Sequence, residues 1–346
     1  MLRPDTEAEL ADMIRAARGP LAVRGGGTRS APAAPGAAVL SVAGIAGITL
    51  YEPEALTLVV RAGTPLDDIL AALAAEGQML AFEPDRRPGS TIGGVVATNA
   101  SGPRRVQSGA CRDALLGVRL VDGEGRVIRN GGRVMKNVTG YDLVKLVAGA
   151  RGRLGVLTEL ALRTQPVPPA ATTLALPGLD APAAVAALTA ALAGPQDVSG
   201  AAWLPGQGAL VRLEGLEGSV AIRARALRER LAPFGEITEA PAAIWSRLPP
   251  RAPEGEDLWR IVCRPSEAGA LLAALPRPLG LDWGGALIWV ALPAGALPVL
   301  PRWSGHARRV TGGPPAVLPA PDPVVATLES GLCAAFDPRA ILSGEV

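Results

Sequence analysis

The stretch Pro88–Gly102 reads PGSTIGGVVATNASG and consists almost entirely of small, uncharged residues. Thr91 stands where an N-cap residue would start a short helix, because its hydroxyl can accept a hydrogen bond from a backbone N–H of the first turn. Gly93 and Gly94 lack a Cβ, so another backbone or a flat ligand can approach that helix closely. The stretch predicts either a small-residue helix packed on a sheet or one wall of a ligand site.

A second glycine segment, RGGGTRS, occupies Arg24–Ser30. Consecutive glycines can turn several backbone N–H groups toward one point, and such a nest binds phosphate oxygens. A Rossmann fingerprint is excluded, because prolines follow instead of a helix and no Asp or Glu occurs from Gly25 to Tyr51. The segment therefore predicts a diphosphate site or a plain surface loop.

A third segment, Lys136–Leu160, reads KNVTGYDLVKLVAGARGRLGVLTEL. Gly152 and Gly155 stand at the start of a strand predicted over Leu154–Thr164 by its alternating apolar residues. Backbone donors at this point could meet a planar ring at the start of the strand. The alternative is a glycine turn that only leads into the strand.

Caps and apolar spacing predict the other elements of the first half. Thr6 and Glu9 form a capping box before a first helix, and Thr64-Pro65 is expected to cap a second one. Asp322-Pro323 is expected to start a last helix. Strands are predicted over Leu21–Arg24, Val39–Val42, Ile48–Tyr51 and Leu56–Arg61, with a hairpin of Leu115–Val121 and Arg126–Arg129 and a helix over Tyr141–Val147.

A domain boundary is predicted near Pro166, Pro168 and Pro169. All six tryptophans lie after these prolines and both lysines lie before them. The sequence thus predicts a first domain over residues 1–168, an α+β domain over 169–320, and a helix with a tail over 321–346. In the second domain we expect strands near 208–214, 258–263 and 286–291, and helices near 219–231 and 266–274.

Composition excludes several classes of function. A formal net charge of +2 gives no basic field, so a nucleic-acid partner is not expected. Three widely spaced cysteines without a C-x-x-C pair argue against a disulfide framework, an iron–sulfur cluster and a structural zinc site. With His306 as the single histidine, a multi-histidine metal centre is impossible, and no metal is expected.

The start of the chain, MLRPDTEAEL, is charged and has no apolar signal core. Two long uncharged stretches, Ala31–Tyr51 and Gly284–Pro301, are interrupted by Pro and Gly and do not read as membrane spans. We therefore expect a cytoplasmic protein without direct membrane insertion, whose attachment to the inner membrane would run through partners.

Taken in order and spacing, these segments resemble the FAD-binding domain of the vanillyl-alcohol oxidase superfamily, the PCMH type, over about residues 5–168. Within it, the chain resembles the smaller FAD-binding subunits, or E subunits, of glycolate oxidases. The resemblance rests on RGGGT (24–28), EPEALT (52–57), GTPLDDI (63–69), STIGGVVATNASGPRR (90–105), VMKNVTGYDLVKL (134–146), LGVLTEL (154–160) and the tail FDPRAILSG (336–344).

The resemblance implies an α+β protein with a PCMH-type FAD-binding domain, a smaller ferredoxin-like cap domain, and a C-terminal tail that closes back on the first domain. It implies that FAD is not covalently bound, because Thr28 and Arg29 stand where many members carry the histidine that bonds the flavin. It assigns the pyrophosphate to Gly25, Gly26, Gly27 and Thr28, the flavin and ribityl side to Ser90, Thr91, Gly93, Gly94, Thr98, Asn99, Ser101 and Gly102, and the adenine end to Gly152, Gly155 and Val156.

The implied function is that of an FAD-binding subunit in a glycolate (2-hydroxy acid) dehydrogenase complex. Its partners would be a catalytic flavin subunit and an iron–sulfur subunit. The catalytic relatives carry a histidine- and glutamate-rich cap motif that this chain lacks, so no residue here is assigned a catalytic role. The alternatives are a stand-alone dehydrogenase that uses cap arginines, and a scaffold without flavin. Structural roles are expected for Cys111, Lys136 and Tyr141. Arg260 is expected to be a solvated strand residue, and His306 is expected to lie at the surface or at an interface.

Overall fold

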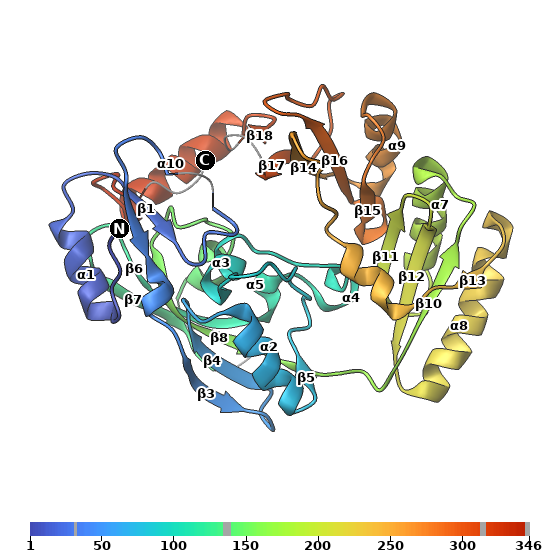
Figure 1. Cartoon of the computed structure of the whole chain (residues 1–346), viewed down its shortest axis with the longest axis horizontal. Coiled ribbons are helices and arrows are strands. Elements are labelled where there is room, and N and C mark those ends of the chain that lie inside the picture. The colour runs from blue at the N-terminus through green and yellow to red at the C-terminus, as the bar shows by residue number, and fades with distance from the viewer. Residues whose placement is uncertain (31–32, 134–139, 312–315, 343–346) are drawn as a thin grey trace. The chain divides into compact units, whose positions relative to one another are not determined.

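The computed structural model describes residues 1–30, 33–133, 140–311 and 316–342, and the chain divides into two compact units (Figure 1). Unit 1 consists of Met1–Ser101, Gly109–Val167 and Pro321–Val346, and unit 2 of Gly102–Ser108 and Pro168–Ala320. Residues 102–108 lie within the predicted run of the first domain and yet group with unit 2. In the described ranges, every helix is too short or too polar to cross a membrane.

Unit 1 is built on a five-stranded antiparallel sheet with the order β3-β4-β8-β6-β7. Leu160 lies between Val60 and Val118 in the pairing register, and all three side chains are buried, so the central strands form one apolar row. The strands of the sheet are β3 (Ile48–Glu52), β4 (Thr57–Arg61), β6 (Leu115–Val121), β7 (Val127–Gly131) and β8 (Val156–Arg163). Two small sheets pair β1 (Leu21–Arg24) with β2 (Ala38–Ser41), in parallel, and β5 (Gln78–Met79) with β9 (Gln165–Pro166).

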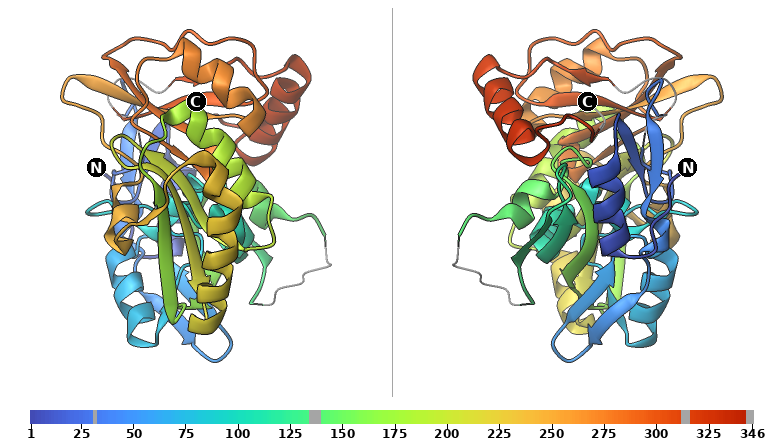
Figure 2. Two further views of the ribbon diagram at one scale, coloured as in Figure 1. Left: turned by 90° about the vertical axis from the view of Figure 1, so that its right-hand side faces the viewer. Right: turned by 90° about the vertical axis from the view of Figure 1, so that its left-hand side faces the viewer.

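Helices of unit 1 bury two separate apolar clusters. The larger cluster lies between the sheet and α2 with α3, and it includes Leu66, Ile69 and Ile92. The smaller one lies under α1, beside the β1–β2 pair, and includes Leu10 and Ile14 (Figure 2). The helices are α1 (Glu7–Ala16), η1 (Val42–Gly44), α2 (Leu66–Ala75), α3 (Ile92–Ala97), α5 (Cys111–Ala114), α6 (Leu143–Val147) and α10 (Pro323–Phe336).

The predicted helix starts are confirmed in part. Thr6 Oγ1 accepts the Glu9 N–H at 3.2 Å, as expected, although the Glu9 carboxylate accepts from Asp5 rather than from Thr6. The prediction that Thr64 caps α2 is wrong, because its hydroxyl donates to the Arg61 carbonyl at 2.7 Å and accepts the Gly47 N–H at 2.8 Å. Thr64 therefore ties the end of β4 to the turn before β3 and leaves Pro65 to start the helix without a side-chain cap.

The last helix and the tail belong to unit 1. Asp322 caps α10 by accepting the Val324 N–H at 2.8 Å, as predicted. After α10 the Ile341 carbonyl accepts the Leu21 N–H at 2.7 Å. Arg339 donates to the carbonyls of Ile14 and Gly123 at 2.6 and 2.8 Å. These bonds fasten residues 336–342 to α1 and to the start of β1.

Unit 2 contains the ferredoxin-like arrangement twice. Its nine-stranded sheet has the order β13-β10-β12-β11-β15-β16-β14-β17-β18. The first four strands of this order, with α7 and α8, follow the β-α-β-β-α-β path. Strands β14 to β17, with α9, have the same strand order read in the opposite direction along the sheet. The two repeats meet where Trp203 of β11 pairs with Leu281 of β15. In the second repeat, residues 294–305 hold no helix.

The strands and helices expected in this half are confirmed, and additional elements complete the two repeats. The first repeat contains β10 (Ala170–Leu176), α7 (Ala181–Leu192), β11 (Val198–Leu204), β12 (Gly208–Gly215), α8 (Glu217–Leu231) and β13 (Thr238–Glu239), followed by η3 (Ala242–Arg247). The second contains β14 (Glu256–Val262), α9 (Pro265–Ala274), β15 (Gly280–Asp282), η4 (Trp283–Gly285), β16 (Leu287–Pro293), β17 (His306–Thr311) and β18 (Val317–Leu318). The segment 102–108 adds α4 (Arg105–Ser108).

Both faces of the unit 2 sheet are covered. Helices α7, α8 and α9 pack on one face over a cluster that includes Trp259 and Val211 (Figure 2). The opposite face carries a second cluster with Trp245, Trp283 and Trp289. The tryptophans of this half are therefore mainly core residues, since five of the six are less than 9% exposed.

Candidate functional site

The glycine nest follows directly on β1. Gly27 has φ +72°, the left-handed conformation that glycine adopts without strain. In the described part of the chain, no protein acceptor meets the backbone N–H groups of Gly25, Gly26, Gly27 or Thr28. These residues are partly or fully exposed. Four neighbouring amide donors are therefore left for a ligand or water, as in the nests that bind anions.

The nest packs directly against the second glycine segment. A Cβ on Gly26 would lie 1.6 Å from the Gly89 carbonyl oxygen, and a Cβ on Gly25 would lie 2.1 Å from Thr91 Oγ1. Both distances are far below van der Waals contact, and at Gly26 the obstacle is backbone, which cannot turn away. The two loops therefore approach each other so closely that only glycine fits at these positions.

Residues Ser90 to Gly94 form the start of α3. Thr91 caps the helix as predicted, with its Oγ1 3.4 Å from the Gly94 N–H. Gly93 faces the sheet, because a Cβ there would lie 2.7 Å from the Ala62 carbonyl oxygen. Gly93 is thus a packing position, whereas the space beside Gly94 is wider, with the nearest atom at 3.5 Å.

Side chains after α3 are engaged within the fold. The Thr98 hydroxyl donates to the Gly94 carbonyl at 2.8 Å. Asn99 has φ +48°, and its Oδ1 accepts the Arg112 N–H at 3.0 Å. Ser101 Oγ accepts the Cys111 N–H at 2.9 Å. These polar groups shape the turn into α5, so what they can present to a ligand is largely backbone.

Gly102 groups with unit 2, whereas the other predicted site residues group with unit 1. Its carbonyl accepts the indole N–H of Trp283 at 3.0 Å. The residue is buried. Its observed role is an anchor for Trp283 on the unit 2 sheet.

The third glycine segment reaches the first two through its backbone. The N–H groups of Gly149 and Arg151 donate to the carbonyls of Val96 and Ala97 at 3.0 and 2.9 Å. Gly152 has φ +81°, and a Cβ on it would lie 4.0 Å from the Cβ of Val23 in β1. The segment thus lies against both the end of α3 and the strand that leads into the nest.

Gly155 and Val156 are packing positions. Gly155 has φ +144°, and a Cβ there would lie 2.4 Å from Leu120 Cδ1. Val156 is 1% exposed within the cluster under α1. Arg153, between these positions, donates to Cys333 Sγ at 3.4 Å and pairs with Glu329 at 3.8 Å, so its side chain is directed to α10.

An ion cluster between the first two segments has no counterpart in the sequence-based site. Arg29 donates to a carboxylate oxygen of Asp85 at 2.5 Å, and Arg87 donates to the other at 2.5 Å. Sequence reasoning noted Arg29 only as a replacement for histidine. The run DRRP at residues 85–88, with three charges inside a loop of small residues, was the available signal.

These features fit FAD. Its pyrophosphate is bound by backbone N–H dipoles, and the nest offers four donors without a competing protein acceptor. The adjoining loops leave no volume for side chains at Gly25 and Gly26. The single histidine, His306, lies in β17 of unit 2. Unit 1 therefore contains no histidine to which a flavin could be bonded.

Comparison with known proteins identifies the family. A family model described as FAD binding domain matches residues 1–131. The glycolate oxidase subunit GlcE of Escherichia coli (strain K12) is 39% identical over 275 residues, which cover 77% of this chain and 75% of GlcE. The chain belongs to the GlcE family. The predicted family, the fold class and FAD as cofactor are confirmed by these matches.

Other relatives of this GlcE-family chain match over shorter spans. The D-lactate dehydrogenase of Anaerostipes hadrus is 36% identical over 41% of this chain and 30% of that protein. The glycolate oxidase subunit GlcD of Bacillus subtilis (strain 168) is 36% identical over 36% of this chain and 26% of GlcD. A solved alkyldihydroxyacetonephosphate synthase superposes with a TM-score of 0.71 at 14% identity, over 99% of this chain and 76% of that one, which shows a shared fold.

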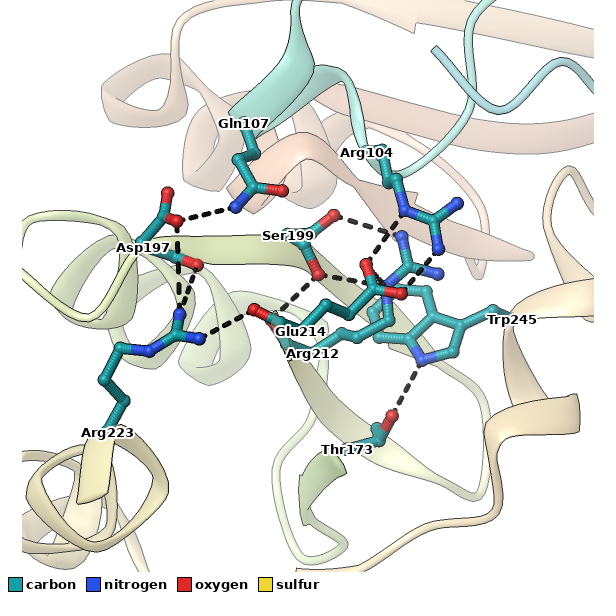
Figure 3. A network of polar contacts seen from close by, with 9 residues as sticks. All are labelled: Arg104, Gln107, Thr173, Asp197, Ser199, Arg212, Glu214, Arg223 and Trp245. Carbon is teal, nitrogen blue, oxygen red and sulfur yellow. Dashed lines mark hydrogen bonds and ion pairs between the residues drawn. The ribbon is translucent and has the colours of Figure 1, made fainter. Parts of the chain in front are cut away.

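Three cap arginines of this GlcE-family chain could bind substrate, namely Arg212, Arg260 and Arg264, and of these Arg212 is held by contacts within the protein. Arg212 and Glu214 both lie on the face of β12 opposite the helices, and their side chains are 3.2 Å apart (Figure 3). Arg212 also donates to the Ser199 carbonyl at 3.1 Å, and its guanidinium stacks 4.6 Å from the Trp245 ring. Arg104, from the segment 102–108, binds the same Glu214 carboxylate through two nitrogens at 2.8 and 2.5 Å.

This network fixes the charge state of Glu214. Burial alone would raise the pKa of the carboxyl, but the hydrogen bonds from Arg104 and the charges of Arg212 and Arg104 outweigh it and hold the pKa below its ordinary value. Arg223 completes the network by donating to the Glu214 carbonyl at 2.7 Å (Figure 3). Within this network Arg212 is a structural residue.

The remaining candidates have the following positions. The Arg260 guanidinium lies 4.9 Å from the Trp283 ring, and the backbone N–H of Arg264 donates to the Glu267 carboxylate at the start of α9. Tyr141 is 90% exposed. Cys111 is fully buried, and burial raises the pKa of its thiol, which argues against a redox thiolate. Lys136 lies outside the described residues.

Proposed function

We propose that this chain is the FAD-binding subunit of a glycolate oxidase complex and holds its FAD without a covalent bond. The observation that carries the proposal is the nest of four amide donors at residues 25–28, which lies against the loop before α3 with no room for side chains. The similarity to GlcE supports the link to glycolate oxidation.

In the proposed binding mode, the amides of Gly25 to Thr28 hold the diphosphate. The backbone around Gly94 and the turn of Thr98, Asn99 and Ser101 form the wall on the flavin side. Gly152, beside β1, is assigned to the adenine end. The residues Ser90, Thr91, Gly93, Gly155 and Val156 support this site through packing and caps. Bound FAD supplies a reversible two-electron acceptor, and the chain's own residues orient it.

We propose further that this subunit relays electrons or assembles the complex, and that another subunit oxidises the substrate. A hydroxy-acid dehydrogenase needs a base for the hydroxyl proton and a cation for the carboxylate. Arg212 is held by Glu214, Ser199 and Trp245 in unit 2, which argues against its use as a carboxylate clamp. We expect a catalytic flavin subunit similar to GlcD and an iron–sulfur subunit as partners, and any membrane association to run through them.

The mode of attachment can be tested on the purified chain. We expect a visible flavin spectrum at about one FAD per chain, since the proposed site is single. Acid precipitation should release all of the flavin into the supernatant, because unit 1 contains no histidine for a bond. The measurement is absorbance of pellet and supernatant. Yellow colour that stays with the washed pellet would contradict non-covalent binding, and a colourless chain that takes up no added FAD would favour the flavin-free scaffold.

The division of labour is tested by anaerobic mixing with glycolate. We expect the flavin of the isolated chain to stay oxidised and the flavin of the co-purified complex to be reduced. The reason is that the base for the hydroxyl proton and the cationic group for the substrate carboxylate are proposed to lie in the partner. The measurement is stopped-flow absorbance of the flavin bands, with dithionite as the control for reducibility. Rapid bleaching of the isolated chain by glycolate would instead establish a stand-alone dehydrogenase.

A further inference from the structure

We propose that Arg29 is a positioning residue for the cofactor, because together with Asp85 and Arg87 it locks the glycine nest onto the loop before α3. We call these three residues the Arg29 clamp. The inference rests on the proposed binding of the FAD diphosphate at residues 25–28. It gives a role to Arg29, which lies in the glycine segment RGGGTRS, and adds Asp85 and Arg87, which none of the motifs quoted for the family resemblance contains.

The first observation is that Arg29 bonds three times to the opposite loop. Its Nη1 donates to the Asp85 carboxylate at 2.5 Å and its Nη2 to the Asp85 backbone carbonyl at 2.6 Å. Its Nε donates to Ser90 Oγ at 3.2 Å. The planar guanidinium thus spans both ends of residues 85–90 from a residue directly after the nest, which a flexible ammonium could not do in the same geometry.

The second observation is a return contact. Arg87 binds the other oxygen of the Asp85 carboxylate and donates through Nη1 to the Thr28 carbonyl at 2.9 Å. Thr28 is itself a member of the nest. The carbonyl of Thr28 is therefore fixed by Arg87, and this contact constrains the backbone that follows the four amide donors.

Burial distinguishes this cluster from a surface ion pair. The side chains of Arg29 and Asp85 are 7% and 13% exposed. The neighbouring pair Arg86–Asp67 joins the same loop to α2, and its side chains are 69% and 58% exposed. Exposed pairs contribute little to stability, whereas loss of one partner from a buried pair leaves an uncompensated charge. The contrast marks Arg29, and not Arg86, as the residue on which loop geometry depends.

Charge in the clamp also favours an anion nearby. Burial lowers the pKa of Arg29, an effect that the Asp85 charge counteracts. Burial would raise the pKa of Asp85, but Arg29 and Arg87 together bring it below its ordinary value, so the carboxylate stays ionised. Two guanidiniums and one carboxylate leave a net charge of +1 next to the open amides. The clamp thus preorganises the nest and adds a favourable field for a diphosphate.

The test compares Arg29→Met and Arg87→Met with Arg86→Met as the matched control. The apo-proteins are titrated with FAD by flavin fluorescence. The affinity for ADP, which shares the adenosine and the diphosphate with FAD but lacks the ribityl chain and the flavin, is measured by competition. We expect Arg29→Met to weaken the binding of FAD and of ADP by the same factor, at least about tenfold, or about 1.4 kcal/mol. Arg87→Met should have a smaller effect in the same direction, and Arg86→Met should bind as the wild type does.

Thermal melting of each apo-protein separates positioning from folding. A purely structural role would lower the melting temperature and leave the dissociation constants, measured well below melting, unchanged, and this result would overturn the proposal. So would a loss of FAD affinity without a loss of ADP affinity, since the effect would then lie away from the diphosphate.

Two milder variants keep the test decisive if Arg29→Met does not fold. Arg29→Lys keeps the charge and loses the fork, so we expect intermediate affinity for both ligands, and wild-type affinity would refute the need for the fork. Ser90→Ala removes only the Nε acceptor and should weaken both ligands less than Arg29→Lys. A wild-type chain that binds no FAD would refute the proposed function itself, whereas unchanged binding in Arg29→Met would refute only the clamp.

Discussion

Replacing Gly26 with alanine is expected to abolish FAD binding. The added Cβ would lie 1.6 Å from the Gly89 carbonyl oxygen and 2.7 Å from its carbon, so one of the two loops must move by more than an ångström. Movement of either loop displaces the amide donors that are proposed to hold the diphosphate. We expect an affinity loss of more than about a hundredfold, or about 2.8 kcal/mol.

The measurement is FAD titration of the apo-protein, with Gly19→Ala as the control. Gly19 lies just before β1, and a Cβ there would meet nothing within 4 Å. Tryptophan fluorescence should be unchanged in both variants, because all six tryptophans lie in unit 2. Stoichiometric FAD in Gly26→Ala would show that the close approach of the two loops is unnecessary for binding.

Replacing Glu214 with glutamine is expected to destabilise unit 2 strongly. The change leaves Arg212, which is 5% exposed, without its carboxylate and deprives Arg104 of a two-nitrogen contact. Loss of one partner from a buried ion pair costs about 3–5 kcal/mol. The measurement is urea unfolding followed by tryptophan fluorescence, which reports unit 2 alone. Flavin content at low urea should remain that of the wild type if the damage is confined to unit 2.

The exposed pair Arg228–Glu239 provides the control. Its side chains are 35% and 66% exposed, so Glu239→Gln should cost at most about 1 kcal/mol. An equal shift in both variants would mean that the buried network has no special weight in the stability of unit 2.

The stability of unit 2 in the same unfolding experiment is expected to fall at low pH because of Glu214. The pKa of Glu214 in the folded protein lies below its ordinary value because of Arg104 and Arg212, so the folded state binds the proton less readily than the unfolded state does. The stabilising contribution of ionised Glu214 is therefore fully present above the ordinary pKa of a glutamate, and it is lost as the pH falls through the folded pKa. Glu214→Gln should remove this part of the acid dependence, and the stabilities of the wild type and the variant should converge at low pH.

Local sequence chemistry was sufficient to predict several elements of the fold. The Thr91 cap on α3 and the Asp322 cap on α10 were predicted from residue type alone, because each contact joins residues within three positions. Thr64 was misassigned since its partners, Gly47 and Arg61, come together only when β3 and β4 pair. The sequence Ala181–Leu192 is almost wholly Ala and Leu and offers no contrast between faces, so α7 was not predicted.

The candidate site shows the same division. The three glycine segments were predicted from composition and resemblance, and the structure brings the backbone of all three together in unit 1. The Arg29–Asp85 pair could not be predicted, because its partners are 56 positions apart and the sequence contains other charged residues that could equally well pair with either of them. Only the fold distinguishes Asp85 from Asp67 as the partner of a buried arginine.

The interlaced path of the chain determines how the protein can be dissected. The polypeptide passes between the units after residues 101, 108, 167 and 320. A fragment that ends at residue 168 would retain Arg104 and Val106 but lose their partners in unit 2. Arg104 would lack Glu214, and Val106 would lack the apolar cluster against which it packs. It would also lack α10 and the Arg339 bonds to α1. Expression of either half alone is thus predicted to yield an incomplete fold, and flavin-binding assays belong on the intact polypeptide.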